Sequence, residues 1–241
     1  MKTAIVTGSN RGIGRAIALR LAQDGMNVVL CARDENLLNE TARTIGPNSL
    51  AVPIDLRLPD SGAKVVDAAL ARFGAIDVLV NNAGATKRGD FETLTDEDFI
   101  DGFALKFFGA VRMTRAAWPH LRKQSGSIVN IVGAGGRTPG AMFSIGGSVN
   151  AAVLSFTKAM SEKGIQDGVQ VNAINPGPVR TARLAAQLRN STEDAFLREH
   201  RIARIGEPED IAALVAFILS PHGRLLQGSL IDADGGSTKT I

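Results

Sequence analysis

Short apolar runs alternate with longer segments of helical periodicity along the whole 241-residue chain. The runs are continuous and do not alternate with polar residues, a pattern typical of parallel strands that are covered on both faces. We therefore expect strands at residues 3–6, 27–32, 49–54, 76–80, 127–132, 170–174 and 229–232. Helical patterns lie between them, at residues 15–22, 35–45, 59–73, 96–121, 147–163, 192–200 and 208–219.

This alternation predicts an α/β fold, a single doubly wound (Rossmann-like) domain around a central parallel sheet of about seven strands. No linker, repeat or low-complexity segment divides the sequence, so we expect residues 1–241 to form one domain. Ligands of such sheets bind beyond the carboxyl ends of the strands. The glycine-rich and asparagine-rich segments of this chain follow predicted strands, and they are therefore the candidate binding segments.

The composition is typical of a soluble globular protein. Apolar residues make up 44% of the chain, charged residues 21%, and the net charge is +3. The basic residues are scattered, which argues against a nucleic-acid partner. No apolar run reaches membrane-spanning length and no targeting segment is recognised, so no membrane partner is expected. The single cysteine, Cys31, excludes an internal disulfide, and together these features favour a cytoplasmic protein.

The strongest local motif is the segment Thr7–Gly14, which reads TGSNRGIG. It follows a predicted strand and opens a predicted helix, which is the context that a dinucleotide-binding turn requires. Glycines allow the tight turn and the close approach of a pyrophosphate, and the helix N-terminus attracts the anion. The weaker alternative is a plain strand-to-helix turn in which the glycines serve packing.

Several further segments, together with this loop, resemble motifs of the short-chain dehydrogenase/reductase family. They are Asp55 after the third strand, the NNAG turn at 81–84, the segment 176–181 and the DGG at 234–236. The resemblance covers essentially the whole chain and implies a nicotinamide dinucleotide, a small-molecule substrate and a homo-oligomer, a tetramer or a dimer. The residues it assigns to the cofactor are Gly8, Asn10, Arg11, Gly12, Ile13, Gly14, Arg33, Asp55, Leu56, Asn82, Ala83, Gly84, Pro176, Gly177, Val179 and Thr181.

Charge at the end of the second predicted strand favours NADP over NAD. An acidic residue at this point binds the ribose diol of NAD, whereas an arginine pairs with the 2′-phosphate of NADP. Arg33 stands at this point, and Arg11 in the glycine loop could add a second cation. In the alternative, Asp34 reaches the ribose and favours NAD, but its place just before a predicted helix suits an N-cap. NADP is therefore the expected cofactor.

The catalytic half departs from the family pattern. The family works with Ser, Tyr and Lys, plus an Asn on the long helix, and this chain contains no tyrosine. An ungapped alignment places Gly133 at the Ser position, Gly146 at the Tyr position and Asn150 at the Lys position. Lys106 stands at the Asn position, so the Lys and Asn residue types have exchanged places.

Lys106 falls on an apolar stripe of the long predicted helix, where a lysine is uncommon unless it is paired or functional. In one interpretation it reaches the site, supplies the lost cation and acts as a general acid/base, its pKa lowered by desolvation. In the other it buries its stem and turns its ammonium to water or a carboxylate. Lys87 and Arg88, after the NNAG turn, either meet an anionic substrate or belong to a solvated loop.

Two functions remain open at this point. The first is an NADP-dependent oxidoreductase that transfers hydride between the nicotinamide and a carbonyl or alcohol, with Lys106 and Asn150 as atypical catalytic residues. The alternative is a catalytically inactive NADP-binding protein that serves as a sensor or partner subunit. No Cys, His and carboxylate grouping has metal-ligand spacing, so no metal is expected. Residues 182–200 are expected to cover the site as a lid.

Overall fold

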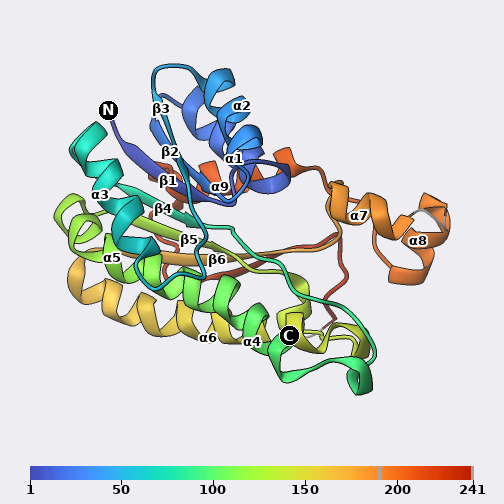
Figure 1. The fold of residues 1–241 in the computed structure, drawn as a ribbon. Coiled ribbons are helices and arrows are strands. Elements are labelled where there is room, and N and C mark those ends of the chain that lie inside the picture. The colour runs from blue at the N-terminus through green and yellow to red at the C-terminus, as the bar shows by residue number, and fades with distance from the viewer. Residues whose placement is uncertain (189–191, 240–241) are drawn as a thin grey trace.

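The computed structural model describes residues 1–188 and 192–239, and its centre is a seven-stranded sheet (Figure 1). The strand order is β3-β2-β1-β4-β5-β6-β7, and every neighbouring pair is parallel. The strands are β1 (Thr3–Thr7), β2 (Asn27–Ala32), β3 (Ser49–Pro53), β4 (Val78–Asn81), β5 (Ser127–Ile131), β6 (Gln170–Pro176) and β7 (Leu230–Ala233). The predicted α/β fold with a parallel sheet is confirmed.

Helices cover both faces of the sheet, as the continuous apolar strands predict. One layer consists of α1 (Gly12–Gln23), α2 (Glu35–Ile45) and α9 (Pro208–Leu219), and the other of α3 (Ser61–Phe73), α5 (Phe108–Gln124) and α6 (Ser144–Asp167). Successive strand residues point to opposite faces. In β1, Val6 therefore packs in the first layer and Ile5 in the second, and both are fully buried.

The order of the strands reverses between β1 and β4, and this is the point where ligands bind in doubly wound sheets. The glycine loop follows β1, and the NNAG turn follows β4, so the topology brings the two segments to the same edge of the sheet. β1 and β4 are paired in parallel, with Val6 opposite Val80. The predicted binding segments therefore meet at the expected place in the fold.

The long helix predicted at 96–121 is interrupted. It consists of α4 (Asp96–Gly102), a π-helical turn (Phe103–Phe107) and α5. The Phe108 N–H donates to the Phe103 carbonyl, five residues back, which widens the helix at this turn. Hydrophobic periodicity could not show the extra residue, because the apolar stripe continues through it. π-helical turns are frequent at functional sites, and Lys106 lies in this one.

Other boundaries differ modestly from the expectation. α6 begins at Ser144, because Gly146 and Gly147 fit a helical turn despite their low helix propensity. Asp34 caps α2 as predicted, with its carboxylate accepting from the Leu37 N–H at 3.1 Å. The chain also forms the unpredicted helix α7 (Ala182–Gln187), followed by α8 (Glu193–His200), and both project beyond the sheet edge (Figure 1). Short 3₁₀ turns occupy Phe91–Thr93, Ala134–Gly136, Ala141–Phe143 and Pro221–Gly223.

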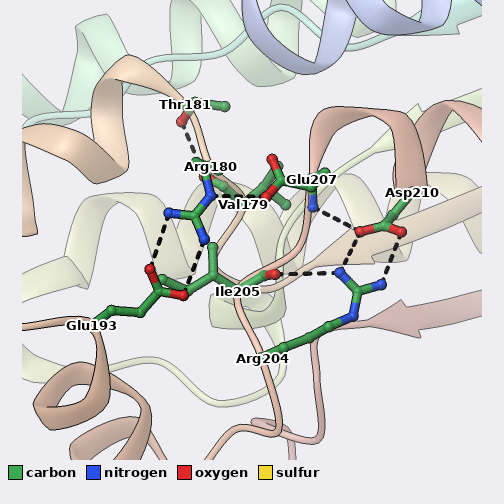
Figure 2. A network of polar contacts seen from close by, with 8 residues as sticks. All are labelled: Val179, Arg180, Thr181, Glu193, Arg204, Ile205, Glu207 and Asp210. Carbon is green, nitrogen blue, oxygen red and sulfur yellow. Dashed lines mark hydrogen bonds and ion pairs between the residues drawn. The ribbon is translucent and has the colours of Figure 1, made fainter.

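A network of ion pairs fastens α8 to the start of α9 (Figure 2). Arg180 donates to both carboxylate oxygens of Glu193, at 3.1 and 3.0 Å, and to Glu207 at 2.8 Å. Arg204 donates to both oxygens of Asp210, at 2.7 and 2.8 Å, and the Glu207 N–H donates to the same carboxylate at 2.7 Å. These donors, Arg204 above all, lower the pKa of Asp210 to about 2.

This network predicts a specific pH dependence of stability. Because the pKa of Asp210 is lowered in the folded protein, its ionised form stabilises the fold above pH 3.8, and that contribution is lost as the pH falls towards 2. Asp210→Asn should therefore lower the urea midpoint at neutral pH, and the difference from the wild type should shrink below pH 3.8. A difference that stays constant from neutral to acid pH would contradict this assignment.

The core makes a second prediction. Leu121 of α5 is 0% exposed, whereas Leu225 after α9 is 95% exposed. Leu121→Ala should lower the free energy of unfolding by about 2–5 kcal/mol, because it removes buried methyl groups and leaves a cavity. Leu225→Ala is the matched control and should change it by no more than about 0.5 kcal/mol. Urea denaturation of the two variants measures both values, and equal effects would contradict the described core.

Candidate active site

The glycine loop forms a tight cradle at the N-terminus of α1. Gly8 and Gly12 have φ angles of +66° and +54°, which L side chains rarely adopt. A Cβ at Gly14 would lie 2.2 Å from the Gly8 carbonyl oxygen, so only glycine lets the helix start this close to the loop. Arg11, the N-cap residue of α1, makes no side-chain capping bond. The first turn of α1 therefore has the form of an anion site, and it fits the pyrophosphate of a dinucleotide.

Side-chain hydrogen bonds hold this loop against the NNAG turn. The Thr7 hydroxyl accepts from the backbone N–H groups of Asn82 and Ala83, at 2.8 and 2.9 Å, and donates to the Val80 carbonyl at 3.3 Å. The Asn82 amide donates to the carbonyls of Thr7 and Gly8, at 2.9 and 3.2 Å. Thr7 was not among the predicted cofactor-binding residues. Its position in the sequence, a hydroxyl residue between a strand and a glycine loop, could have indicated this role.

The segment after β6 lies beside the same cradle. A Cβ at Gly12 would come within 3.3 Å of the Thr181 methyl group, and one at Gly177 within 2.7 Å of Asp234. The structure thus brings the glycine loop, the segment 176–181 and the C-terminal DGG together. Of the predicted cofactor residues, four pack their side chains in or against the hydrophobic core; these are Ile13, Leu56, Ala83 and Val179.

A cluster of charged side chains lies beyond the carboxyl ends of β2 and β3. Arg33 is 64% exposed on its side chain and lies 4.0 Å from Asp55. Arg57 donates to Asp55 at 3.4 Å and to both oxygens of Asp101, at 2.6 and 3.0 Å. The Arg57 guanidinium holds the pKa of Asp101 below its usual range. Arg57 and Asp101 were not predicted, because they lie 44 residues apart in the sequence.

Arg112 connects this end of the site to the π-helical turn. Its guanidinium donates to the carbonyls of Leu56 and Ala104, both at 3.2 Å. In an α-helix the Phe108 N–H would donate to Ala104, but here it donates to Phe103. Arg112 therefore supplies the hydrogen bond that the Ala104 carbonyl lacks in the π-helical turn. Its second hydrogen bond, to Leu56, links the segment after β3 to the turn that carries Lys106.

Lys106 and Asn150 meet at the carboxyl edge of the sheet. The Lys106 ammonium donates to Asn150 Oδ1 at 2.6 Å and to the Val132 carbonyl at 2.5 Å. Asn150 is 3% exposed, and its amide lies 3.5 Å from the Gly133 carbonyl. Lys106 thus reaches across to α6 and β5.

Two glycines make room for this pair. The stem of Lys106 passes over Gly84 of the NNAG turn, where a Cβ would lie 2.8 Å from its Cδ atom. Gly133 has a φ of +138°, and a Cβ there would lie 3.0 Å from the Asn150 amide nitrogen. A serine at 133 would be strained in this backbone and would crowd Asn150.

The space beside Gly146 is filled by an aromatic ring. A Cβ at Gly146 would lie 2.0 Å from Phe143 Cζ, so the ring occupies the volume into which a side chain at 146 would extend. The same ring covers Gly135, where a Cβ would lie 2.9 Å from it. The Arg88 guanidinium lies over the Phe143 ring, with its central carbon 4.0 Å from the ring centroid.

Among residues 1–188 and 192–239, no group of three or more His, Cys, Asp or Glu side chains could hold a metal ion. Over the same part of the chain, none of the helices has the length and apolar character needed to cross a membrane.

Comparison with known proteins places the whole chain in one family. A family model described as enoyl-(acyl carrier protein) reductase matches residues 8–238. The 3-oxoacyl-(acyl-carrier-protein) reductase FabG of Vibrio cholerae is 32% identical over 240 residues, which cover 98% of this chain and 96% of that protein.

Solved structures agree with this match. L-sorbose reductase from Gluconobacter frateurii, complexed with NADPH and L-sorbose, is 31% identical with a TM-score of 0.93, over 100% of this chain and 97% of that one. A short-chain oxidoreductase from Pseudomonas aeruginosa PAO1, described as containing an atypical catalytic center, is 26% identical with a TM-score of 0.93, over 100% and 98%. From the glycine cradle to the DGG turn, this chain belongs to the short-chain dehydrogenase/reductase family of oxidoreductases.

Proposed function

We propose that the protein is an NADP-dependent oxidoreductase that interconverts a carbonyl and an alcohol, with Lys106 and Asn150 at its catalytic centre. The observation that carries this proposal is the 2.6 Å contact between the Lys106 ammonium and Asn150. The contact lies at the carboxyl end of β5, two strands along the sheet from β1, which carries the glycine cradle. Partial burial of a lysine ammonium costs desolvation free energy, and lysines are rarely buried unless they are paired or functional. A half-buried lysine held by two oxygens at the carboxyl edge of the sheet therefore favours a functional role. The Ser, Tyr and Lys of the family are absent from the positions where its alignment expects them.

The geometry suggests how the residues share the work. When bound, the nicotinamide supplies or accepts the hydride. In the reducing direction, Lys106 Nζ gives a proton to the substrate oxygen, and in the oxidising direction it takes that proton back. The Val132 carbonyl and Asn150 Oδ1 accept from the ammonium and hold it in place. Gly84 lets the lysine stem pass close to the turn, so that Nζ reaches the edge of the sheet.

The choice of NADP rests on Arg33. Its guanidinium is exposed at the carboxyl end of β2, and its nearest acidic partner, Asp55, lies only at the 4.0 Å limit of an ion pair. An arginine in this place suits a 2′-phosphate through two parallel hydrogen bonds. Asp34 is committed to capping α2, which removes the main argument for NAD. The NADPH found with L-sorbose reductase fits the same choice.

Further parts of the proposal follow from family membership. We propose one domain over residues 1–241 and a homo-oligomer, a dimer or a tetramer, that works in the cytoplasm. The relative described as having an atypical catalytic center supports an active enzyme, because departure from the usual residues occurs elsewhere in the family. The competing function is a catalytically inactive NADP-binding protein, and the absence of tyrosine is the observation that favours it.

Replacing Lys106 tests the proposed chemistry. A panel of carbonyls with NADPH, and of alcohols with NADP⁺, should reveal turnover in the wild type. Lys106→Met should lower kcat about 10²–10⁴-fold, the usual contribution of a general acid/base, while the Kd for NADPH changes little. Lys64→Met is the matched control, because Lys64 forms an exposed ion pair with Asp60 on α3, away from the site.

Two outcomes would overturn the proposal. Turnover that survives Lys106→Met would remove the proposed proton carrier. Tight NADPH binding by the wild type, with no turnover on the whole panel, would instead favour the inactive NADP-binding protein.

Replacing Arg33 tests the cofactor separately. Arg33→Ala should weaken NADPH binding about 10- to 100-fold, because the charge-assisted contact with the 2′-phosphate is lost, and should leave NADH binding nearly unchanged. Titration of both cofactors by protein fluorescence or calorimetry measures this. Equal losses for both cofactors, or tighter binding of NADH by the wild type, would contradict the assignment.

A further inference from the structure

Arg112 donates hydrogen bonds to two chain segments that lie far apart in the sequence. Its Nη1 lies 3.2 Å from the Ala104 carbonyl in the π-helical turn and 3.2 Å from the Leu56 carbonyl after β3. The Ala104 carbonyl needs this donor, because the Phe108 N–H bonds to Phe103 instead. A half-buried carbonyl without a donor costs free energy, so the contact with Arg112 stabilises the widened turn.

Packing fixes Arg112 in this place. A Cβ at Gly62 of α3 would lie 2.5 Å from the Arg112 carbonyl oxygen, so the backbones of α3 and α5 touch at this point. The Arg112 guanidinium also lies over the Phe108 ring, with its central carbon 5.6 Å from the ring centroid. The residue is therefore held at its backbone by a neighbouring helix and at its guanidinium by a ring, which limits the positions that its donors can occupy.

A second arginine links the same two segments. Arg57, directly after Leu56, donates to both carboxylate oxygens of Asp101, at 2.6 and 3.0 Å, and Asp101 lies in α4 just before the π-helical turn. A Cβ at Gly109 of α5 would lie 3.4 Å from Leu56 Cβ, which is an ordinary packing distance. The segment after β3 thus holds the turn from both ends, through Asp101 before it and through Gly109 and Arg112 after it.

The turn that these contacts hold determines where Lys106 points. Lys106 follows Ala104 within the turn, and its stem crosses Gly84 with little room to move. If the turn relaxed to α-helical hydrogen bonding, its residues would rotate about the helix axis by up to about 100°, the angle that one residue occupies. The ammonium would then leave Asn150 Oδ1 and the Val132 carbonyl, which it reaches at 2.6 and 2.5 Å.

We infer that Arg112 is a positioning residue for Lys106, because it holds the π-helical turn and thereby keeps the lysine ammonium at Asn150. The inference rests on the proposed role of Lys106 as the proton carrier. Since Arg112 also bonds to Leu56, it ties the turn to the segment that contains the predicted cofactor residues Asp55 and Leu56. One guanidinium then holds both the proton carrier and this part of the cofactor site.

A double-mutant cycle tests whether Arg112 acts through Lys106. Arg112→Met keeps an apolar stem and removes both hydrogen bonds. It should lower kcat about 10- to 100-fold, as displacement of a reacting group by about 1 Å does, and change the substrate KM less than about twofold. In a Lys106→Met background the same substitution should cause no further loss, because the residue that it positions is gone. Arg115→Met, at an exposed position of α5, is the matched control and should leave kcat unchanged.

Two measurements on the full chain report the turn without turnover. Hydrogen exchange of a peptide that covers residues 103–108, followed by mass spectrometry, should be at least about tenfold faster in Arg112→Met, because the turn opens more often. Modification of Lys106 by an amine-selective reagent should become about tenfold faster, because two oxygens no longer hold its charged form. Arg115→Met should match the wild type in both measurements, and α9 should exchange equally in all variants.

The outcomes separate this inference from the proposed function. Faster exchange and faster Lys106 modification in Arg112→Met, with no turnover by the wild type on any substrate, would uphold the positioning of Lys106 and defeat the proposed chemistry. Turnover that requires Lys106 but is unchanged in Arg112→Met would overturn the inference, as would unchanged exchange or an equally large loss in the Lys106→Met background. Arg112→Gln, with its shorter side chain, replaces Arg112→Met if that variant does not fold, and the same results are expected of it.

Discussion

The hydrogen bonds between Thr7 and Asn82 are the contact on which the rest of the site depends. They join the ends of β1 and β4, the two strands between which the sheet reverses its order. Because the Thr7 hydroxyl and the Asn82 amide bond to backbone groups, they set the path of both loops. The glycine cradle on one side and the lysine stem over Gly84 on the other are then placed relative to each other.

Much of this arrangement could be predicted from the sequence, because the signals are local. The strand after residue 27 and the helix capped by Asp34 were predicted with the boundaries that the structure shows. The continuous apolar strands predicted a sheet covered on both faces. The structure has a buried hydrophobic cluster on each side of β1, as this pattern requires. The cofactor half of the site follows from topology, since its motifs all come after strands of one parallel sheet.

The rest depends on contacts between distant residues and on local geometry. The π-helical turn at Phe103–Phe107 leaves no mark in the hydrophobic period, yet it lies where Lys106 crosses to Asn150. The Phe143 ring packs the 3₁₀ turn Ala141–Phe143 onto Gly146 of α6. The ion pair of Arg57 with Asp101 joins residues that are 44 positions apart in the sequence. The sequence alone does not show which side chains fill the volume around Gly133 and Gly146.

The packing around the glycines at 133 and 146 limits the substitutions that the site can accept. A serine at 133 would meet the Asn150 amide in a backbone conformation that favours glycine, and a tyrosine at 146 would collide with the Phe143 ring. Single substitutions at these glycines are therefore disfavoured, and a larger residue at either one needs a compensating change in its neighbour, Asn150 for position 133 and Phe143 for position 146.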